Sequence, residues 1–415
     1  MHKAVNDCVI IGGGASGLFA ACYLKYLDPY CDICIVEKMP RVGKKLLLTG
    51  SGRCNISNAR ISAKDYHTDD EDKLSAVLKS FDVNETVQFY ENNLGIVLTR
   101  KGDLYYPLTL RSATVLDSLR FYIEERGVEF ILEDPAVRVA SSVSGYLVQL
   151  KSGSTVSSSN ILIATGGRSY PKTGSEGDAI ELANKFLKSE DIIPYAPALV
   201  PLTSDKTGIK NLAGIRFNGS ISIISDDHEH ARSEGEILFA KDGGLTGIAV
   251  LDVSDTVLRL LDKGDKPYAS LNLIGKSSGD VLMMLYIRRQ LFPNRTVCDA
   301  FSGIIHRVLL EGVLRDCNID PRAKVSSIND AGLTKISNVL CGWSISLSGA
   351  KGFEDAQVSS GGIKLGCLTD NMEYKGSRGL YFAGEAVNVN GICGGYNLQW
   401  AWSSAVCAAR GILDV

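Results

Sequence analysis

Residues 7–27 read DCVIIGGGASGLFAACYLKYL, an apolar strand, then a glycine-rich turn, then a helix with small residues on its first turns. Gly12, Gly14 and Gly17 have GxGxxG spacing, and a second expected strand ends at Glu37, where the dinucleotide-binding fingerprint requires an acid. The glycines permit a tight turn, a close approach of the backbone to a pyrophosphate, and close packing of helix on strand. The helix N-terminus attracts phosphates, and the acid accepts ribose hydroxyls. The stretch predicts a Rossmann-like nucleotide site; the alternative is a glycine-rich turn without a ligand.

Two later segments favour FAD over NAD and divide the nucleotide-binding domain between the two ends of the chain. Residues 160–167, NILIATGG, read as a buried strand that ends in a glycine turn. Residues 379–412 contain a strand ending in Gly384 and Glu385, a glycine-rich loop, and a long apolar helix from about Asn397. Both segments resemble motifs that two-dinucleotide-fold flavoproteins place around FAD. If the N-terminus of the last helix faces the flavin, it stabilises the negative charge that develops on reduction.

The stretch LLTGSGRCNISN, residues 47–58, is rich in small residues and carries one cation, one thiol and one amide. Glycine and serine let the backbone lie very close to a planar ring. We expect this loop to contact the isoalloxazine, with Arg53 and Asn55 offering hydrogen-bond donors to ring or substrate oxygens. A surface turn capped by asparagine is the alternative.

Seven blocks of the sequence resemble the BaiN/RdsA-like family of NAD(P)/FAD-dependent oxidoreductases, which includes proteins named aminoacetone oxidases. In order, the blocks are GGGASGLFAA, GKKLLLTGSGRCNISN, ATGGRSYPKTGSEGD, PALVPL, GEILFAKDGGLTG, VSSGGI and GLYFAGEAVNVNGICGGYNLQWAWS. The resemblance covers nearly the whole chain and implies FAD as the cofactor. It implies FAD contacts from Gly12, Gly14, Ala15, Ser16, Gly17, Glu37, Lys38, Lys45, Arg53, the backbone near Val137, Thr165, Gly166, Gly384, Glu385, Asn397 and Gln399.

The resemblance also implies an α/β fold with a split Rossmann-like FAD-binding domain and an inserted β-barrel-like domain that carries a small helical domain. The residue pattern fits this domain order, because short strand-like runs begin near residue 191 and a helical pattern begins near residue 277. Residues 128–140 and 145–153 predict an antiparallel hairpin within the FAD domain. The expected domains are residues 1–190 with 353–415 for FAD, 191–276 with 336–352 for the barrel-like part, and 277–335 for the helical insert.

The chain departs from the family in one inserted segment. The family commonly has Thr-His where this sequence has Ala240 and Lys241, and Ser-Gly-Pro where it has Thr246, Gly247 and Ile248. If that segment meets the substrate, the substrate preferred here differs from that of other members.

Composition limits the partners. The 415 residues carry a net charge of -3, so no overall field recruits DNA or an anionic membrane. The sequence has no signal-peptide pattern and no apolar run of about 20 residues, which predicts a cytoplasmic protein. Eleven cysteines without framework spacing fit reduced thiols. The oligomeric state is unspecified.

Three smaller features have a binding interpretation and a plainer one. Cys31 and Cys34 form a CxxC in an expected strand, where buried thiols are favoured over a redox or metal pair. His228 and His230 are expected at a polar hairpin tip, and no metal site is expected. Between residues 281 and 324 seven basic residues stand against four acidic ones. That excess could follow an RNA backbone, but a solvated helix face is the commoner reason for it.

The leading functional hypothesis is hydride transfer from NAD(P)H to flavin N5 and on to a conjugated C=C. Since no second GxGxxG follows a strand, NAD(P)H would dock transiently. The substrate would be a small molecule, such as an enone of a dehydro bile acid or steroid, or uracil in ribosomal RNA. A general acid would protonate the adjacent carbon, with Cys54 and Tyr396 as candidates for that acid. Arg53 is the third catalytic candidate, as a hydrogen-bond donor. Cys54 as a packing residue and Tyr396 as an anchor of the last helix are the structural alternatives. The functional alternatives are an amine oxidase of the aminoacetone type that uses oxygen and an FAD-containing RNA- or protein-binding module.

Overall fold

The computed structural model describes residues 5–143 and 145–415 and divides them into two compact units. The first unit comprises the residues up to Ala198 and those from Phe353 to Val415, and the second runs from Leu199 to Gly352. The chain therefore leaves the first unit once and returns to it, as a split FAD domain requires. In the described residues no helix is both long enough and apolar enough to cross a bilayer.

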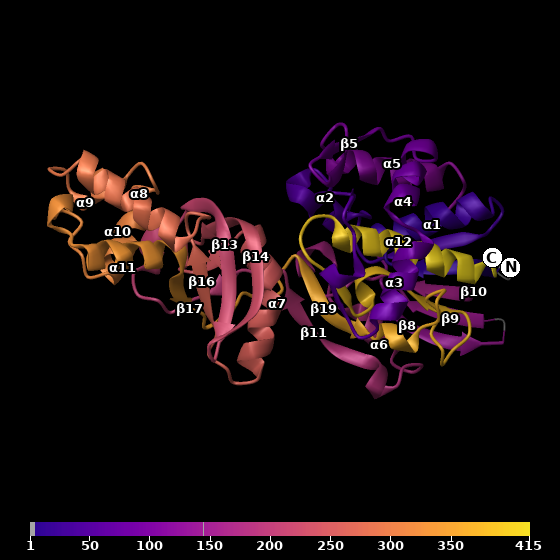
Figure 1. Ribbon diagram of the computed structural model, residues 1–415. Helices are drawn as coiled ribbons and strands as arrows, with labels where there is room; N and C mark the ends of the chain where they lie inside the picture. The colour runs from indigo at the N-terminus through magenta and orange to yellow at the C-terminus, as the bar shows by residue number, and fades with distance from the viewer. Residues whose placement is uncertain (1–4, 144) are drawn as a thin grey trace. The chain divides into compact units, whose positions relative to one another are not determined.

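A seven-stranded sheet forms the centre of the first unit (Figure 1). Five strands run parallel in the order β7-β2-β1-β10-β20, and the hairpin β8-β9 extends the sheet from the first half of β10. Strands β1, β2 and β20 and the last three residues of β10 are almost wholly buried, as expected for apolar strands in the middle of a parallel sheet. The bounds are β1 Asn6–Ile11, β2 Ile33–Glu37, β7 Glu129–Leu132, β8 Ala136–Ser142, β9 Gly145–Leu150, β10 Thr155–Ile163 and β20 Leu380–Phe382.

The expected hairpin is confirmed for its second half only. Strands β8 and β9 pair antiparallel, but residues 129–132 form β7, which pairs parallel with β2. The sequence pattern did not separate them because both runs are short and β-branched, and only pairing distinguishes them.

Helices cover this sheet. The long α12 (Tyr396–Ile412) packs along α1 (Ala15–Leu27), so the two ends of the chain share one core. The other helices of this unit are α2 Lys44–Gly52, α3 Glu71–Ser80, α4 Val83–Asn92, α5 Ser112–Glu124 and α6 Asp178–Ala183. Smaller sheets pair β3 (Ser57–Asn58) with β6 (Leu104–Pro107) and β5 (Leu98–Lys101), β4 (Tyr66–Thr68) with β21 (Val389–Gly391), and β11 (Ile192–Ala198) with β19 (Val358–Ile363).

The strand β11 places the boundary of the first unit later than the expected residue 190. Its residues pair antiparallel with β19, which follows the insert, so the two strands belong to one sheet of the first unit. The sequence pattern of β11 resembles that of the strands after it, and only this long-range pairing assigns it to the first unit.

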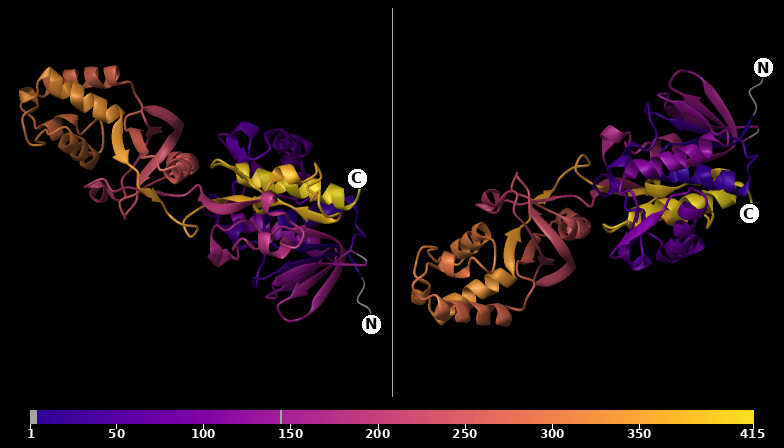
Figure 2. Two further views of the ribbon diagram at one scale, coloured as in Figure 1. Left: turned by 90° about the horizontal axis from the view of Figure 1, so that it is seen from below. Right: turned by 90° about the horizontal axis from the view of Figure 1, so that it is seen from above.

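The second unit is built on a seven-stranded antiparallel sheet. Helices α8–α11 gather at one end of this sheet and α7 packs on its opposite side (Figures 1 and 2). One hydrophobic cluster runs through sheet and helices, so the helical segment shares its core with the strands. In sheet order the strands are β17 Trp343–Ser346, β16 Tyr268–Asn272, β13 Arg216–Ser225, β14 His228–Phe239, β15 Leu245–Thr246, β12 Leu202–Thr203 and β18 Gly349–Ala350. The helices are α7 Ile248–Asp262, α8 Ser278–Leu291, α9 Val297–Phe301, α10 Arg307–Asp316 and α11 Asp330–Cys341.

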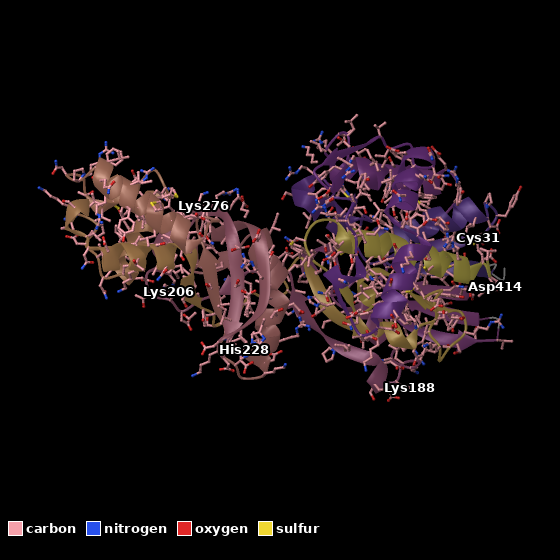
Figure 3. The ribbon with its side chains drawn as sticks, in the orientation of Figure 1. Cys31, Lys188, Lys206, His228, Lys276 and Asp414 are labelled. Atoms are coloured by element: carbon pink, nitrogen blue, oxygen red, sulfur yellow. The ribbon has the colours of Figure 1, made fainter. Side chains whose placement is uncertain are left out.

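The histidine pair has the structure expected from the sequence, whereas the CxxC was expected wholly within a strand and only Cys34 lies in one. Cys34 lies in β2 and Cys31 just before it, both are buried, and burial raises the pKa of Cys31 to about 12. His228 and His230 are exposed at the end of the β13-β14 hairpin, where His228 faces Ser225 across the turn (Figure 3).

Candidate functional site

The glycine turn after β1 has the close packing that a dinucleotide cradle needs. Gly12 has φ +108°, and a Cβ built on it would lie 2.5 Å from the carbonyl oxygen of Ala164 at the end of β10. A Cβ on Gly17 would collide with the carbonyl oxygen of Gly12. Any side chain at either position would force β1, β10 and α1 apart. Gly14, Ala15 and Ser16 follow at the N-terminus of α1, in the positions predicted to face the phosphates.

Glu37 at the end of β2 is held beside this turn. Its carboxylate accepts hydrogen bonds from the backbone N–H groups of Gly13 (2.8 Å) and Met39 (2.7 Å). Burial raises the pKa of Glu37, although both hydrogen bonds oppose the rise. The carboxylate is therefore fixed next to the glycine turn, as expected for the acid that accepts ribose hydroxyls.

Lys38 is engaged in an ion-pair cluster. Its Nζ lies 2.6 Å from Asp178 and 2.7 Å from Glu176, both on the segment that follows the ATGG turn. Burial lowers the pKa of Lys38, but the hydrogen bonds from these carboxylates outweigh it and the net shift is upward. The amine thus ties the end of β2 to residues 176–178, so the expected cofactor contact of Lys38 rests on its backbone or its aliphatic stem.

Lys45 and Glu385 form the second ion pair of the site. Lys45 Nζ donates to Glu385 Oε2 (2.6 Å) and to the hydroxyl of Ser169. Glu385 Oε1 accepts the backbone N–H of Ser359 (2.7 Å) and the hydroxyl of Ser169 (3.0 Å). Sequence reasoning missed both serines, although they stand in the quoted blocks ATGGRSYPK and VSSGGI. The structure gives them a role as partners that fix Glu385.

The stretch 53–58 meets the glycine-rich loop before α12. Ser57 Oγ donates to Gln399 Oε1 (2.6 Å), and Asn58 Nδ2 donates to the carbonyl oxygen of Gly394 (2.9 Å). Trp402 Nε1 donates to the carbonyl oxygen of Ile56 (2.9 Å). The structure thus joins the two stretches that the sequence assigns to the flavin, from opposite ends of the chain.

Within that stretch three candidate residues have different environments. Arg53 is exposed, and its Nε donates to the carbonyl oxygen of Gly50 at 3.2 Å. Cys54 is fully buried, and burial raises its pKa to about 12. Asn55 is buried, and its Oδ1 has no hydrogen-bond partner in the described residues. Arg53 can reach a ligand, whereas the burial of Cys54 favours the packing role over that of a proton donor.

The N-terminus of α12 carries no side-chain cap in the described part of the chain. The side chain of Asn397 binds back to the N–H (2.9 Å) and carbonyl oxygen (2.8 Å) of Gly391. Gln399 is fully buried, and both ends of its amide bind protein groups. Because both side chains bind protein groups, Asn397 and Gln399 could make the expected FAD contacts only through their backbone atoms. Tyr396 packs edge-on against Tyr66, which agrees with its role as an anchor.

Two further candidates have different surroundings: Gly384 packs on α1, whereas Val137 lies in the β8-β9 hairpin with an exposed side chain. Gly384 has φ +65° and packs so closely on α1 that a Cβ there would lie 2.6 Å from Ser16 Oγ. Val137 falls in a β-bulge of β8, where backbone groups lie outside the regular ladder. Four residues before Val137, the backbone N–H of Glu133 donates to the carbonyl oxygen of Met39 (3.4 Å), which lies just after β2.

Buried polar atoms without partners test whether FAD fits this site. Thr165 Oγ1, Asn55 Oδ1 and Asn390 Oδ1 are buried and have no hydrogen-bond partner among the described residues. Most buried polar groups are paired, so such atoms indicate a missing ligand or an ordered water. Thr165 follows β10 beside the glycine turn, and Asn55 lies in the stretch expected at the isoalloxazine. The donor set, the glycine cradle and the open helix N-terminus together fit a dinucleotide that carries a flavin.

Comparison with known proteins agrees with this geometry. A model of the HI0933-like protein Rossmann domain family matches residues 6–411. The chain belongs to this family. The match spans both units and confirms the resemblance seen in the sequence.

Two relatives and one solved structure illustrate the HI0933-like family and its fold. The chain is 29% identical to a 3-dehydro-bile acid delta(4,6)-reductase of Clostridium scindens, over 98% of each chain. It is 28% identical to a ribosomal RNA dihydrouridine synthase of Escherichia coli, again over 98% of each. The structure of 3-ketosteroid delta1-dehydrogenase from Sterolibacterium denitrificans covers 99% of this chain and 100% of its own, with a TM-score of 0.53 and 13% identity. That last likeness concerns the fold alone.

Proposed function

We propose that this HI0933-like chain is an FAD-dependent oxidoreductase that reduces a conjugated C=C with electrons from NAD(P)H. One observation carries the cofactor assignment: the glycine turn, Glu37 and the unpartnered Thr165 hydroxyl lie at the ends of neighbouring parallel strands. Ligands of open α/β sheets bind at this edge of the sheet. The junction of residues 53–58 with α12 supplies the second half of the cradle.

Each part of the cradle has a distinct task. Gly12–Gly17 and the N-terminus of α1 would hold the pyrophosphate, and Glu37 the adenosine ribose. The Lys45–Glu385 pair would hold the linker that leads to the ring. The free N–H groups at the start of α12 would stabilise negative charge on the pyrimidine side. The flavin, when bound, supplies hydride transfer through N5.

The direction of electron flow is proposed from the relatives. The names of both relatives denote reduction of a carbon–carbon double bond, one in a 3-dehydro bile acid and one in uridine of ribosomal RNA. An enone and a uracil ring each present an electron-poor carbon, so one mechanism serves both substrates. NAD(P)H is proposed to dock transiently. A general acid must protonate the adjacent carbon, and the full burial of Cys54 disfavours it for that task. The exposed Arg53 keeps its proton and would instead donate hydrogen bonds to a ring or substrate oxygen.

The inserted unit is proposed to be barrel-like and to serve substrate recognition. Its seven strands follow one antiparallel path from β17 to β18, which agrees with the antiparallel pairing of such a domain, whereas a closed barrel would also pair these two edge strands. Some of the basic residues between positions 281 and 324 form ion pairs within the chain. Arg289 pairs with Asp330 (2.7 Å) and Arg307 with Asp299 (3.0 Å), so these two guanidinium groups are not free for a phosphate backbone.

The test is anaerobic mixing of the FAD-loaded protein with NADH, NADPH and aminoacetone in turn, with flavin absorbance near ~450 nm as the readout of reduction. Rapid bleaching by a nicotinamide supports the reductase. Bleaching by aminoacetone alone would replace it with an amine oxidase. If neither reagent changes the flavin spectrum, the FAD is structural and the protein is a binding module. A positive result would be followed by a screen of bile-acid-like enones and uridine-containing RNA.

A further inference from the structure

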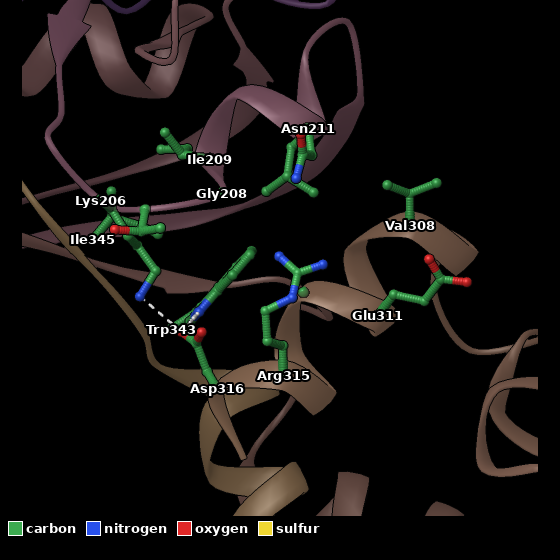
Figure 4. A pocket seen from close by; sticks show the side chains of 13 residues that line it. Lys206, Gly208, Ile209, Asn211, Val308, Glu311, Arg315, Asp316, Trp343 and Ile345 are labelled. Carbon is green, nitrogen blue, oxygen red and sulfur yellow. Dashed lines mark hydrogen bonds and ion pairs between the residues drawn. The ribbon is translucent and has the colours of Figure 1, made fainter. Parts of the chain in front are cut away.

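The second unit contains a cavity of about 220 Å³. It lies between the segment after β12, helix α10 and strand β17, and all residues that line it belong to this unit (Figure 4). The dinucleotide cradle is built from the first unit alone, so the cavity is not part of it. Its apolar lining includes Ile209, Leu212, Val308, Trp343 and Ile345, and its charged lining is Lys206, Glu311, Arg315 and Asp316.

Three of the four charged residues are neutralised within the protein. Asp316 Oδ2 accepts hydrogen bonds from Lys206 Nζ (2.7 Å) and from Trp343 Nε1 (2.7 Å). Burial favours the neutral acid, but these two donors outweigh it and lower the pKa of Asp316. Glu311 Oε1 accepts from Arg307 Nε (3.2 Å). Neither acid of the cavity therefore lacks a partner.

Arg315 is the charge that remains. Arg315 is exposed and forms no ion pair within residues 5–143 and 145–415; its charge acts on Asp316 only at longer range, where it helps to lower the pKa of that acid. Figure 4 shows this group extending from α10 towards the turn that carries Gly208 and Asn211. Its Nη1 lies 2.9 Å from the position that a Cβ on Gly208 would occupy, so the glycine makes room for it. An unpaired planar guanidinium beside an apolar wall matches a carboxylate, which it binds in a fork.

We propose that this cavity binds a small organic carboxylate, with the carboxylate on Arg315 and a short apolar body against Val308, Ile209 and Trp343. This is a second ligand site, separate from the proposed flavin site. The volume suits a fragment of this kind rather than a drug-sized ligand. A singly charged anion fits better than a phosphate dianion, because Glu311 and Asp316 line the same space and would repel a second negative charge.

The experiment uses the full-length, FAD-loaded protein and saturation-transfer NMR at neutral pH. The probes are hexanoate, hexyl phosphate and hexan-1-ol, which share one apolar chain and differ in the head group. The test variant is Arg315→Gln, and Arg322→Gln is the matched control because it removes the same charge from an exposed arginine outside the cavity. Both substitutions are at exposed positions, so both variants are expected to fold.

The expected result is hexanoate binding to the wild-type protein and to Arg322→Gln, with an affinity at least about tenfold lower for Arg315→Gln. Hexan-1-ol should bind more weakly than hexanoate. Hexanoate binding that is absent from the wild-type protein, or equal in Arg315→Gln, would overturn the site. Equal binding of hexan-1-ol, or tighter binding of hexyl phosphate, would overturn the assignment to a carboxylate. Because the readout does not involve the flavin, a failure here leaves the proposed function intact.

Discussion

Ser57 Oγ donates a 2.6 Å hydrogen bond to Gln399 Oε1, across 342 positions of sequence. Gln399 Nε2 in turn donates to Thr86 Oγ1 (2.9 Å) and Ser403 Oγ (3.0 Å). This buried amide joins the stretch expected at the flavin to helix α12, whose N-terminus is proposed to face the flavin. The position of one half of the cradle therefore depends on the other.

Replacing the amide should loosen this junction. Gln399→Met is expected to lower the free energy of unfolding by about 1–3 kcal/mol, because it removes four buried hydrogen bonds and leaves the Ser57 hydroxyl without its acceptor. FAD affinity should fall as well, measured by quenching of flavin fluorescence. Gln149→Met, at an exposed position on β9, is the control and should change neither. A Gln399→Met protein with unchanged unfolding and unchanged FAD affinity would contradict the role of this network.

Thr165 offers a test in which stability and cofactor binding separate. Its Oγ1 is buried without a partner, so Thr165→Val should leave the stability of the apoprotein unchanged or raise it. If FAD is the missing partner, FAD affinity should fall about tenfold, which isothermal titration calorimetry would measure.

Thr86→Val is the matched control for that substitution. Thr86 Oγ1 already donates to the carbonyl oxygen of Asp82 (2.8 Å). Its loss should lower the free energy of unfolding by about 1–2 kcal/mol. If Thr165→Val behaved like Thr86→Val in the apoprotein, the hydroxyl of Thr165 would have a partner other than FAD.

Glu37 predicts a pH dependence of FAD binding. In the proposed site the ionised carboxylate would accept both ribose hydroxyls, whereas the protonated form would lose one acceptor. Burial raises the pKa of Glu37 above its ordinary value of 4.5, so FAD affinity should fall as the pH drops through a value above 4.5. Glu37→Gln should bind FAD about tenfold more weakly at neutral pH and lose this pH dependence. An identical pH profile in both proteins would assign the dependence to another group.

The Lys45–Glu385 pair predicts a partial rescue. Lys45→Met leaves a mostly buried carboxylate without its cation, and should cost about 1–3 kcal/mol, between the values for exposed and buried pairs. Adding Glu385→Gln should restore most of the stability, measured by urea denaturation. FAD affinity should not recover, because both polar contacts are then gone. Recovery of FAD binding in the double variant would show that neither group touches the cofactor.

Substitution of Cys54 distinguishes a packing role from a role as the general acid. Because it is fully buried, Cys54→Ala should cost about 1–2 kcal/mol of stability and change the turnover of a C=C substrate by no more than about threefold. Cys22→Ala, at another fully buried thiol, is the control for packing loss. Loss of a general acid would instead slow turnover by about 10²–10⁴-fold, which stopped-flow kinetics would detect.

Much of the nucleotide site was predictable from the sequence because its determinants are local. The spacing of Gly12, Gly14 and Gly17 between a strand and a helix specifies the turn, and the next strand places Glu37 beside it. The ATGG turn and the Gly384–Glu385 pair end buried strands, so their position at the same edge of the sheet follows from parallel pairing. Two predictions were inaccurate: the boundary of the FAD unit at residue 190 and the first half of the hairpin at residues 128–140. In both cases neighbouring strands have the same sequence pattern, and only their pairing partners distinguish them.

The sequence by itself determined the family, the nucleotide-binding edge and the split of the FAD unit, because backbone turns and strand ends are specified by neighbours along the chain. Only the tertiary structure decided that Gln399 serves Ser57, that Lys45 pairs with Glu385 across 340 positions, and that Cys54 is buried. Nor could the sequence show that Arg315 alone lacks a counter-ion among the charged residues of its cavity. The physical reason is that pairing and burial depend on what the fold brings within a few ångströms, and these partners come from segments far apart in the chain.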